Sequence, residues 1–151
     1  MGTIAALLAR MAGQRVYLDS NVFIYFLDRN PMCLPLVAPL LETIDRGGII
    51  GTTGGAAVAE VMVRPYQTGD PALIAGIKSF FDSAGFLSVR SHHAAAFDLA
   101  APLRARHGMK LIDALHVATA INAECRFLLT NDGAFRSQAA LELVSLRGLL
   151  A

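Results

Sequence analysis

The stretch Val16-Tyr17-Leu18-Asp19-Ser20-Asn21 decides the fold class, because a short apolar run ends here in an acid and two further helix-capping residues. Such a run is typical of a buried strand, whereas Asp, Ser and Asn are preferred at the first position of a helix. A strand that leads directly into a helix is the unit from which parallel sheets are built. This stretch therefore predicts an α/β protein.

The alternation of strand and helix continues along the chain. Further apolar runs lie at residues 49–52, 86–89, 127–129 and 142–146, and helical patterns lie at 21–28, 34–46, 56–63, 71–84, 93–107 and 111–123. We expect Pro39 to kink the second of these helices and Pro65 to lie beyond the end of the third, since proline lacks the N–H that a helix interior needs. The pattern predicts a central, mainly parallel sheet covered by helices and preceded by a small amphipathic helix within residues 1–14.

The composition sets further limits. Of the 151 residues, 54% are hydrophobic and 17% are charged, which argues against disorder and fits a single domain, 1–151. The net charge of +1 means that a polyanion would have to be bound by a local cluster of charges. Cys33 and Cys125 are expected to be reduced and buried, with a chance disulfide as the alternative. No apolar run reaches about 18 residues and residues 1–14 make a poor signal peptide, so we expect a cytoplasmic protein without a membrane span.

Four acids stand where a polar side chain is locally unexpected. Asp19 and Asp132 follow predicted strands, and Glu60 and Asp113 interrupt apolar helical segments. In a parallel α/β sheet, ligands gather at the carboxyl ends of the strands. The four side chains can therefore share one edge of the sheet.

Such a cluster needs a counter-charge. Carboxylates about 4 Å apart repel by several kcal/mol at an effective dielectric near 20, so they cannot all stay ionised unaided. Mg²⁺ or Mn²⁺ supplies that charge, since hard cations prefer oxygen ligands, and such an ion can assist phosphodiester hydrolysis.

Each acid also has a simpler interpretation. Asp19 can be a helix N-cap, and Asp132, in Asn-Asp-Gly, can be a turn residue. Glu60 and Asp113 are costly to bury unpaired, although a Lys or Arg partner would remove that cost. The joint pattern favours a cluster over four separate explanations.

At these same positions the chain resembles the PIN-domain ribonucleases, and among them the toxins of the VapC type. The resemblance is carried by four stretches in the same order and spacing, which are Tyr17-Leu18-Asp19-Ser20-Asn21-Val22-Phe23-Ile24-Tyr25, Ala59-Glu60-Val61, Leu111-Ile112-Asp113-Ala114-Leu115-His116-Val117-Ala118-Thr119-Ala120 and Leu129-Thr130-Asn131-Asp132. It covers nearly the whole chain and implies a three-layer α/β/α PIN-like domain in which residues 1–14 are an N-terminal helical extension.

The resemblance also implies function. By this resemblance the catalytic and metal-binding quartet consists of Asp19, Glu60, Asp113 and Asp132. The supporting residues are Asn21, Thr130 and the adjacent Ser20. Members of the family that this chain resembles are Mg²⁺- or Mn²⁺-dependent endoribonucleases. We therefore expect an RNA substrate, a small antitoxin partner and a homodimer.

Two further groups of residues have open roles. His116 lies three residues after Asp113, so it can support a carboxylate or be a buried structural histidine. The other histidines, His92, His93 and His107, lack zinc-site spacing and are expected at the surface. The candidates for contact with RNA are basic residues near the acids in sequence, although each can equally stabilise a helix end or a salt bridge: Arg15, Arg64, Arg104, Arg106, Lys110 and Arg136.

Two alternatives to a nuclease remain. A receiver-like signalling domain also gathers acids and Mg²⁺ at strand ends, but it needs a Lys after a late strand, and neither Lys78 nor Lys110 is so placed. A catalytically inactive PIN-like binding protein would keep the fold without the chemistry, and the intact quartet argues against it.

Overall fold

The computed structural model describes residues 3–83, 85–133, 135, 138 and 140–150 of the chain. Five strands form one sheet with the order β3-β2-β1-β4-β5, and every neighbouring pair is parallel. The strands are β1 (Arg15–Leu18), β2 (Ile50–Gly54), β3 (Leu87–Arg90), β4 (Phe127–Thr130) and β5 (Glu142–Ser145). The strand order reverses direction between β1 and β4, and ligands of open parallel sheets bind at the carboxyl ends of the strands at such a point.

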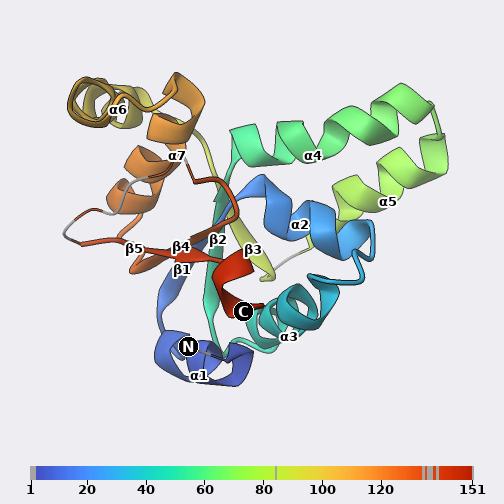
Figure 1. The fold of residues 1–151 in the computed structure, drawn as a ribbon. Helices are drawn as coiled ribbons and strands as arrows, with labels where there is room; N and C mark the ends of the chain where they lie inside the picture. Colours follow the sequence, from blue (N-terminus) through green and yellow to red (C-terminus); the bar gives the residue numbers. More distant parts are fainter. Residues whose placement is uncertain (1–2, 84, 134, 136–137, 139, 151) are drawn as a thin grey trace.

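Helices cover both faces of this sheet (Figure 1). They are α1 (Ile4–Met11), α2 (Ser20–Leu27), α3 (Leu34–Asp45), α4 (Gly55–Thr68), α5 (Pro71–Asp82), α6 (Ala94–His107) and α7 (Leu111–Asn122), with a short 3₁₀ turn, η1 (Arg147–Leu149), near the C-terminus. Side chains alternate across a strand, so Val16 and Leu18 pack into the core beneath α1 to α5, whereas Tyr17 packs into a second core beneath α6 and α7. The expected three-layer α/β/α arrangement is confirmed.

The expected helix end before Pro65 is wrong. Helix α4 continues through this residue to Thr68 and ends at Gly69, which adopts the left-handed conformation with φ 69°. Pro65 is buried, so its ring adds to the core, and the Thr68 hydroxyl donates to its carbonyl. One missing backbone hydrogen bond is therefore tolerated, as it is at Pro39 inside α3.

The N-terminal helix belongs to the packed structure. Leu7 and Met11 of α1 are buried in the larger core, and Arg10 forms an ion pair with Glu142 at 2.7 Å. Both cysteines are free and buried, as expected. Within the described ranges, no helix is both long and apolar enough to cross a bilayer.

Candidate active site

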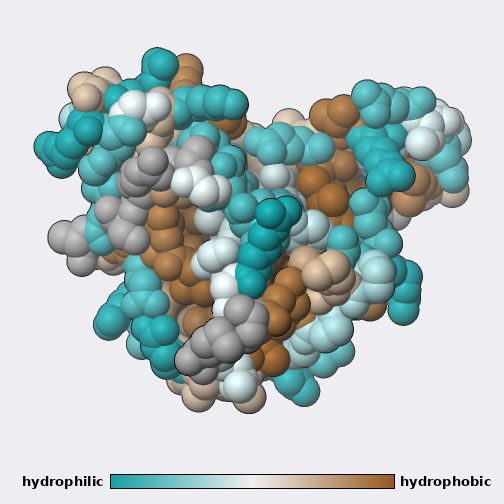
Figure 2. Space-filling model, viewed as in Figure 1, coloured by the Kyte–Doolittle hydropathy of each residue, from teal (hydrophilic) through white to brown (hydrophobic). Residues whose placement is uncertain are grey.

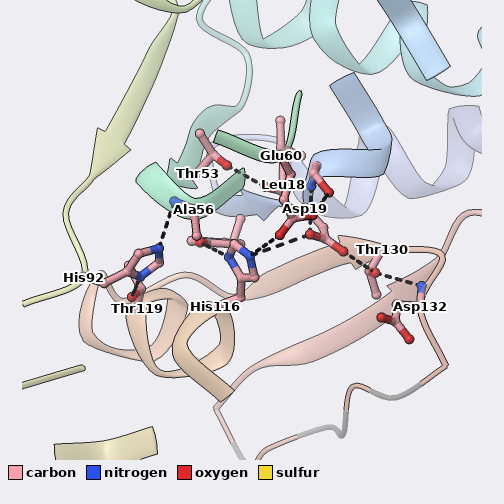
Figure 3. A network of polar contacts seen from close by, with 12 residues as sticks. Leu18, Asp19, Thr53, Ala56, Glu60, His92, His116, Thr119, Thr130 and Asp132 are labelled. Carbon is pink, nitrogen blue, oxygen red and sulfur yellow. Dashed lines mark hydrogen bonds and ion pairs between the residues drawn. The ribbon is translucent and has the colours of Figure 1, made fainter. Parts of the chain in front are cut away.

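Asp19 occupies the end of β1 and the N-cap position of α2. The residue is 5% exposed, and each carboxylate oxygen accepts one hydrogen bond, Oδ1 from the Ser20 backbone N–H at 2.7 Å and Oδ2 from the Thr130 hydroxyl at 2.8 Å. The capping role expected for Asp19 is therefore present. The same contacts hold its carboxylate in one orientation between β1 and β4 (Figure 3).

Glu60, on α4, is joined to Asp19 through Ser20. The Ser20 hydroxyl donates to Glu60 Oε2 at 2.7 Å, while the Glu60 side chain remains 47% exposed. Its interaction with the His116 imidazole lowers the pKa of Glu60, Ser20 acts in the same direction, and partial burial opposes them. Glu60 thus stays ionised at neutral pH and faces solvent.

Asp113 and Asp132 complete the acidic group. Asp113 is buried in the first turn of α7, and burial, followed by the charges of Asp132 and Asp19, raises its pKa. Asp132 is exposed, and its backbone N–H donates to the Thr130 hydroxyl that also contacts Asp19. The structure therefore brings all four acids to the carboxyl edge of the sheet, at the point where the strand order reverses.

His116 is buried behind these carboxylates. Its side chain is 1% exposed, its Nδ1 lies 2.7 Å from the Tyr17 hydroxyl, and its Nε2 lies 3.7 Å from Glu60 Oε1 and 4.0 Å from Asp19 Oδ1. Nε2 has no hydrogen-bond partner in the part of the chain that the structure describes.

The hydroxyl of Tyr17 determines which ring nitrogen of His116 carries the hydrogen. Burial and the nearby Asp19 charge raise the pKa of Tyr17 well above its usual range, so the hydroxyl keeps its proton. Among the described residues the hydroxyl makes a hydrogen bond with His116 Nδ1. Because a buried O–H without an acceptor costs about 1–3 kcal/mol, the hydroxyl needs this nitrogen as its acceptor. Tyr17 therefore donates to Nδ1, and in the neutral ring Nε2–H points toward the carboxylates. This geometry favours the supporting role of His116 over a purely structural one.

Gly54 makes room for this arrangement. A Cβ atom at this position would lie 2.5 Å from His92 Cε1 and closer still to the Tyr17 hydroxyl. Glycine is therefore required here by a close approach of two side chains.

We predict that Gly54→Ala destabilises the protein by about 1–3 kcal/mol, because the added methyl overpacks a buried position. The change is measured as the urea midpoint of unfolding. Gly55→Ala is the matched control, since a Cβ at this exposed neighbour would meet only the Arg90 carbonyl at 3.9 Å. Equal midpoints for the two variants would contradict the close approach.

The basic candidates lie at different distances from the acids. Lys110 is the N-cap residue of α7, and its charge partly offsets the raised pKa of Asp113. Arg64 follows Glu60 by one turn of α4 and forms an ion pair with Asp28 at 3.0 Å.

The remaining arginines are less directly placed. Arg104 donates to the Met109 carbonyl near the end of α6, and Arg106 lies in the same last turn. Arg15 lies at the start of β1, at the opposite end of that strand from Asp19, and donates to the Ala123 carbonyl, so the structure does not bring it to the acids. Arg136 lies outside the described residues.

His92 was missed by sequence reasoning. It is half-buried and both of its ring nitrogens have polar partners, so its expected place at the surface is wrong. His93, its neighbour, is exposed as expected. No periodicity or spacing distinguishes the two in the sequence, because the difference arises from contacts with α4 and α7.

The donor set fits a hydrated divalent cation. It consists of carboxylate oxygens, and the nearby Asn21 at the start of α2 has a buried Oδ1 without a hydrogen-bond partner among the described residues. The same part of the chain contains no ready-made group of three metal-ligating side chains. Mg²⁺ commonly uses only one or two protein carboxylates and keeps several waters, so this looser arrangement suits it.

Comparison with known proteins identifies the family of the chain and agrees with the fold. Residues 16–141 match the model of the PIN domain, and the chain therefore belongs to the PIN domain family. No curated protein matches it in sequence.

Solved structures with a similar fold include three toxin or toxin–antitoxin structures. VapBC2 from Rickettsia felis, bound to a promoter DNA fragment, has a TM-score of 0.67 and 17% identity over 87% of this chain and 98% of that chain. A toxin–antitoxin complex from Klebsiella pneumoniae has a TM-score of 0.62 and 16% identity over 83% and 94%. The sarcin–ricin-loop-cleaving toxin VapC20 from Mycobacterium tuberculosis has a TM-score of 0.63 and 12% identity over 78% and 90%. At these identities the similarity shows the fold alone.

Proposed function

We propose that this protein is a divalent-metal-dependent endoribonuclease and the toxin of a VapC-type toxin–antitoxin pair. The observation that carries the proposal is the group of four acids at the reversal of strand order. Ser20 and Thr130 join Asp19 to Glu60 and Asp132, and the charges of Asp132 and Asp19 act on Asp113. The family and the toxins with a similar fold support it. Membership of the PIN family also removes the receiver-like alternative.

In this proposal the catalytic residues are Asp19, Glu60, Asp113 and Asp132. They would hold Mg²⁺ or Mn²⁺, one or two of them directly and the others through waters of the ion. The bound ion would lower the pKa of water and stabilise negative charge on the phosphodiester. Ser20 and Thr130 orient the carboxylates, Asn21 supplies a further oxygen, and the His116 N–H offsets part of their charge. The raised pKa of Asp113 indicates that the acids repel one another and therefore favour a cation.

The RNA needs positive charge that the acids do not provide. The candidates best placed to contact phosphates are Lys110, near Asp113, and Arg64, near Glu60. Two further candidates, Arg104 and Arg106, lie in the last turn of α6. Arg15 is a weaker candidate, because its guanidinium binds the Ala123 carbonyl away from the acids.

The proposed antitoxin has a suitable place to bind. A hollow of about 410 Å³ lies between α2, α4 and α5, and hydrophobic side chains gather over these helices (Figure 2). Its lining includes Ile24, Leu27, Leu73 and Ile77, and Glu60 lies at its edge. A partner segment with apolar side chains and one arginine would fill the hollow and satisfy the carboxylates, since a guanidinium binds two of their oxygens at once. We also propose a homodimer in the cytoplasm.

Metal dependence provides the direct test. We expect the protein to cleave RNA with Mn²⁺ or Mg²⁺ and to lose about a hundredfold or more of its rate in EDTA, because the ion carries the charge stabilisation of the reaction. Cleavage of a panel of structured and single-stranded RNAs is measured on gels, and added Mn²⁺ in excess of EDTA should restore it. Full activity in EDTA would contradict the mechanism. Complete inactivity with both ions would favour a PIN-like binding protein without catalysis.

A further inference from the structure

The start of α4 has no capping side chain of its own. Gly54 occupies the N-cap position, and the first N–H groups of any helix lack partners within the helix. His92, which lies between β3 and α6, supplies the missing acceptor, because the Ala56 backbone N–H donates to His92 Nε2 at 3.2 Å. A residue 36 positions away in the sequence therefore caps this helix.

The second nitrogen of the same ring contacts α7. His92 Nδ1 lies 2.7 Å from the hydroxyl of Thr119, which is 4% exposed. Nε2 accepts the Ala56 N–H and so carries no hydrogen, which places the hydrogen of the neutral ring on Nδ1. His92 therefore donates to Thr119 while it accepts from Ala56.

These two bonds join the helices that carry the acids. Glu60 follows Ala56 by one turn of α4, and its N–H belongs to the hydrogen-bonded turn that begins there. Thr119 lies on α7 with Asp113 and His116, and the rings of His92 and His116 meet edge to face with centroids 5.5 Å apart (Figure 3). This approach is possible because Gly54 has no Cβ atom, which would clash with the His92 ring.

We propose that His92 is a positioning residue, which caps α4 and links it to α7 so that Glu60 is held at the proposed catalytic site. The catalytic meaning of this inference rests on the proposed function. The cap itself is a property of the fold and can be tested without RNA.

The cap requires an uncharged ring. Burial lowers the pKa of His92 below its ordinary value of 6.5, and electrostatic repulsion from His116 and His93 acts in the same direction. The titratable groups around it are His116 from α7, His93 in its own segment and the Tyr17 hydroxyl from β1. Protonation would direct a hydrogen at the Ala56 N–H and place a positive charge at a helix N-terminus, which the helix dipole disfavours. The stabilisation from the cap is therefore complete above about pH 6.5 and is lost as the pH falls through the lower folded-state pKa.

Two substitutions separate the cap from the ring. His92→Ala removes the acceptor, whereas His92→Gln keeps an amide oxygen that can accept from Ala56. In the metal-free protein, hydrogen exchange of the Ala56 and Glu60 amides should be about tenfold faster in His92→Ala than in wild type, and should be restored in His92→Gln. His93→Ala is the control and should exchange as wild type does.

The same variants are then tested with RNA and Mn²⁺. We expect His92→Ala to lower kcat about tenfold with a smaller change in KM, and His92→Gln to recover most of kcat. The ratio of the wild-type rate to the His92→Gln rate should decrease as the pH falls through the lowered pKa of His92, since the glutamine takes up no proton there.

The outcomes distinguish the inference from the proposed function. Wild-type kcat in His92→Ala, together with faster exchange at Ala56, would overturn the positioning role. Unchanged exchange in His92→Ala would overturn the cap. If wild type cleaves no RNA, the proposed function fails, but faster exchange at both Ala56 and Glu60 would still support the link between His92 and Glu60.

Discussion

Asp19→Asn should reduce RNA cleavage by about a hundredfold or more, because it removes one charge from the centre of the acidic site. The substitution leaves the local structure intact. Asn is as good an N-cap as Asp, so it can still accept from the Ser20 N–H, and its amide can donate to the Thr130 hydroxyl. Loss of activity would therefore report the missing charge. The measurement is the cleavage rate at saturating Mn²⁺.

Asp98→Asn is the control for this experiment. Asp98 is an exposed acid on α6, so its substitution removes the same charge elsewhere and should leave the rate unchanged. An Asp19→Asn rate within about threefold of wild type, a difference of roughly 0.7 kcal/mol, would show that Asp19 acts only as a helix cap.

The same pair of proteins tests the toxin assignment in cells. Wild type expressed alone should arrest growth, and Asp19→Asn should not. Co-expression of a small protein encoded by the adjacent gene should restore growth and give a stable complex, because a basic side chain of the partner can occupy the acidic site. If neither protein arrests growth at matched levels of soluble expression, and neither cleaves RNA with Mn²⁺, the non-catalytic binding protein would be favoured.

Asp113→Asn should leave the metal-free protein as stable as wild type or more stable. Burial and the charges of Asp132 and Asp19 raise the pKa of Asp113, so the folded state holds its proton more tightly than the unfolded chain does. Stability from this group is consequently lost as the pH rises through the ordinary Asp value toward the raised one, and the ionised carboxylate is unfavourable at neutral pH. Its place in the first turn of α7 is favourable to a negative charge, but the raised pKa means that burial and repulsion exceed this effect.

The thermal shift with Mn²⁺ completes this prediction. A ligand at a hundred times its Kd adds about 2.7 kcal/mol, so wild type should gain roughly 5–10 °C and Asp113→Asn clearly less. In the metal-free form, the advantage of the variant should shrink as the pH falls toward the raised pKa of Asp113, where the wild-type carboxylate takes up a proton. A lower melting temperature for the metal-free variant would identify Asp113 as a structural residue instead.

The sequence by itself predicted most of the strand and helix pattern and marked the four acids as candidates. Both are local properties, because apolar periodicity follows from the geometry of one element and an acid that interrupts an apolar run is visible from its neighbours. The same reasoning explains why a helix N-cap was among the interpretations of Asp19 open from the sequence: its capping hydrogen bond is made by the next residue, Ser20.

Only the tertiary structure decided how the site is held together. The contact of Asp19 with Thr130 joins positions 111 residues apart and exists because the strand order places β1 beside β4. The contact of Tyr17 with His116 joins positions 99 residues apart and exists because α7 packs on the face of the sheet to which Tyr17 points. His92 looks like its neighbour His93 in the sequence, yet it caps α4, because the chain between β3 and α6 passes the open helix start at Gly54. Hydrogen bonds of this kind depend on which elements contact each other in the fold, and a local sequence pattern does not indicate those contacts.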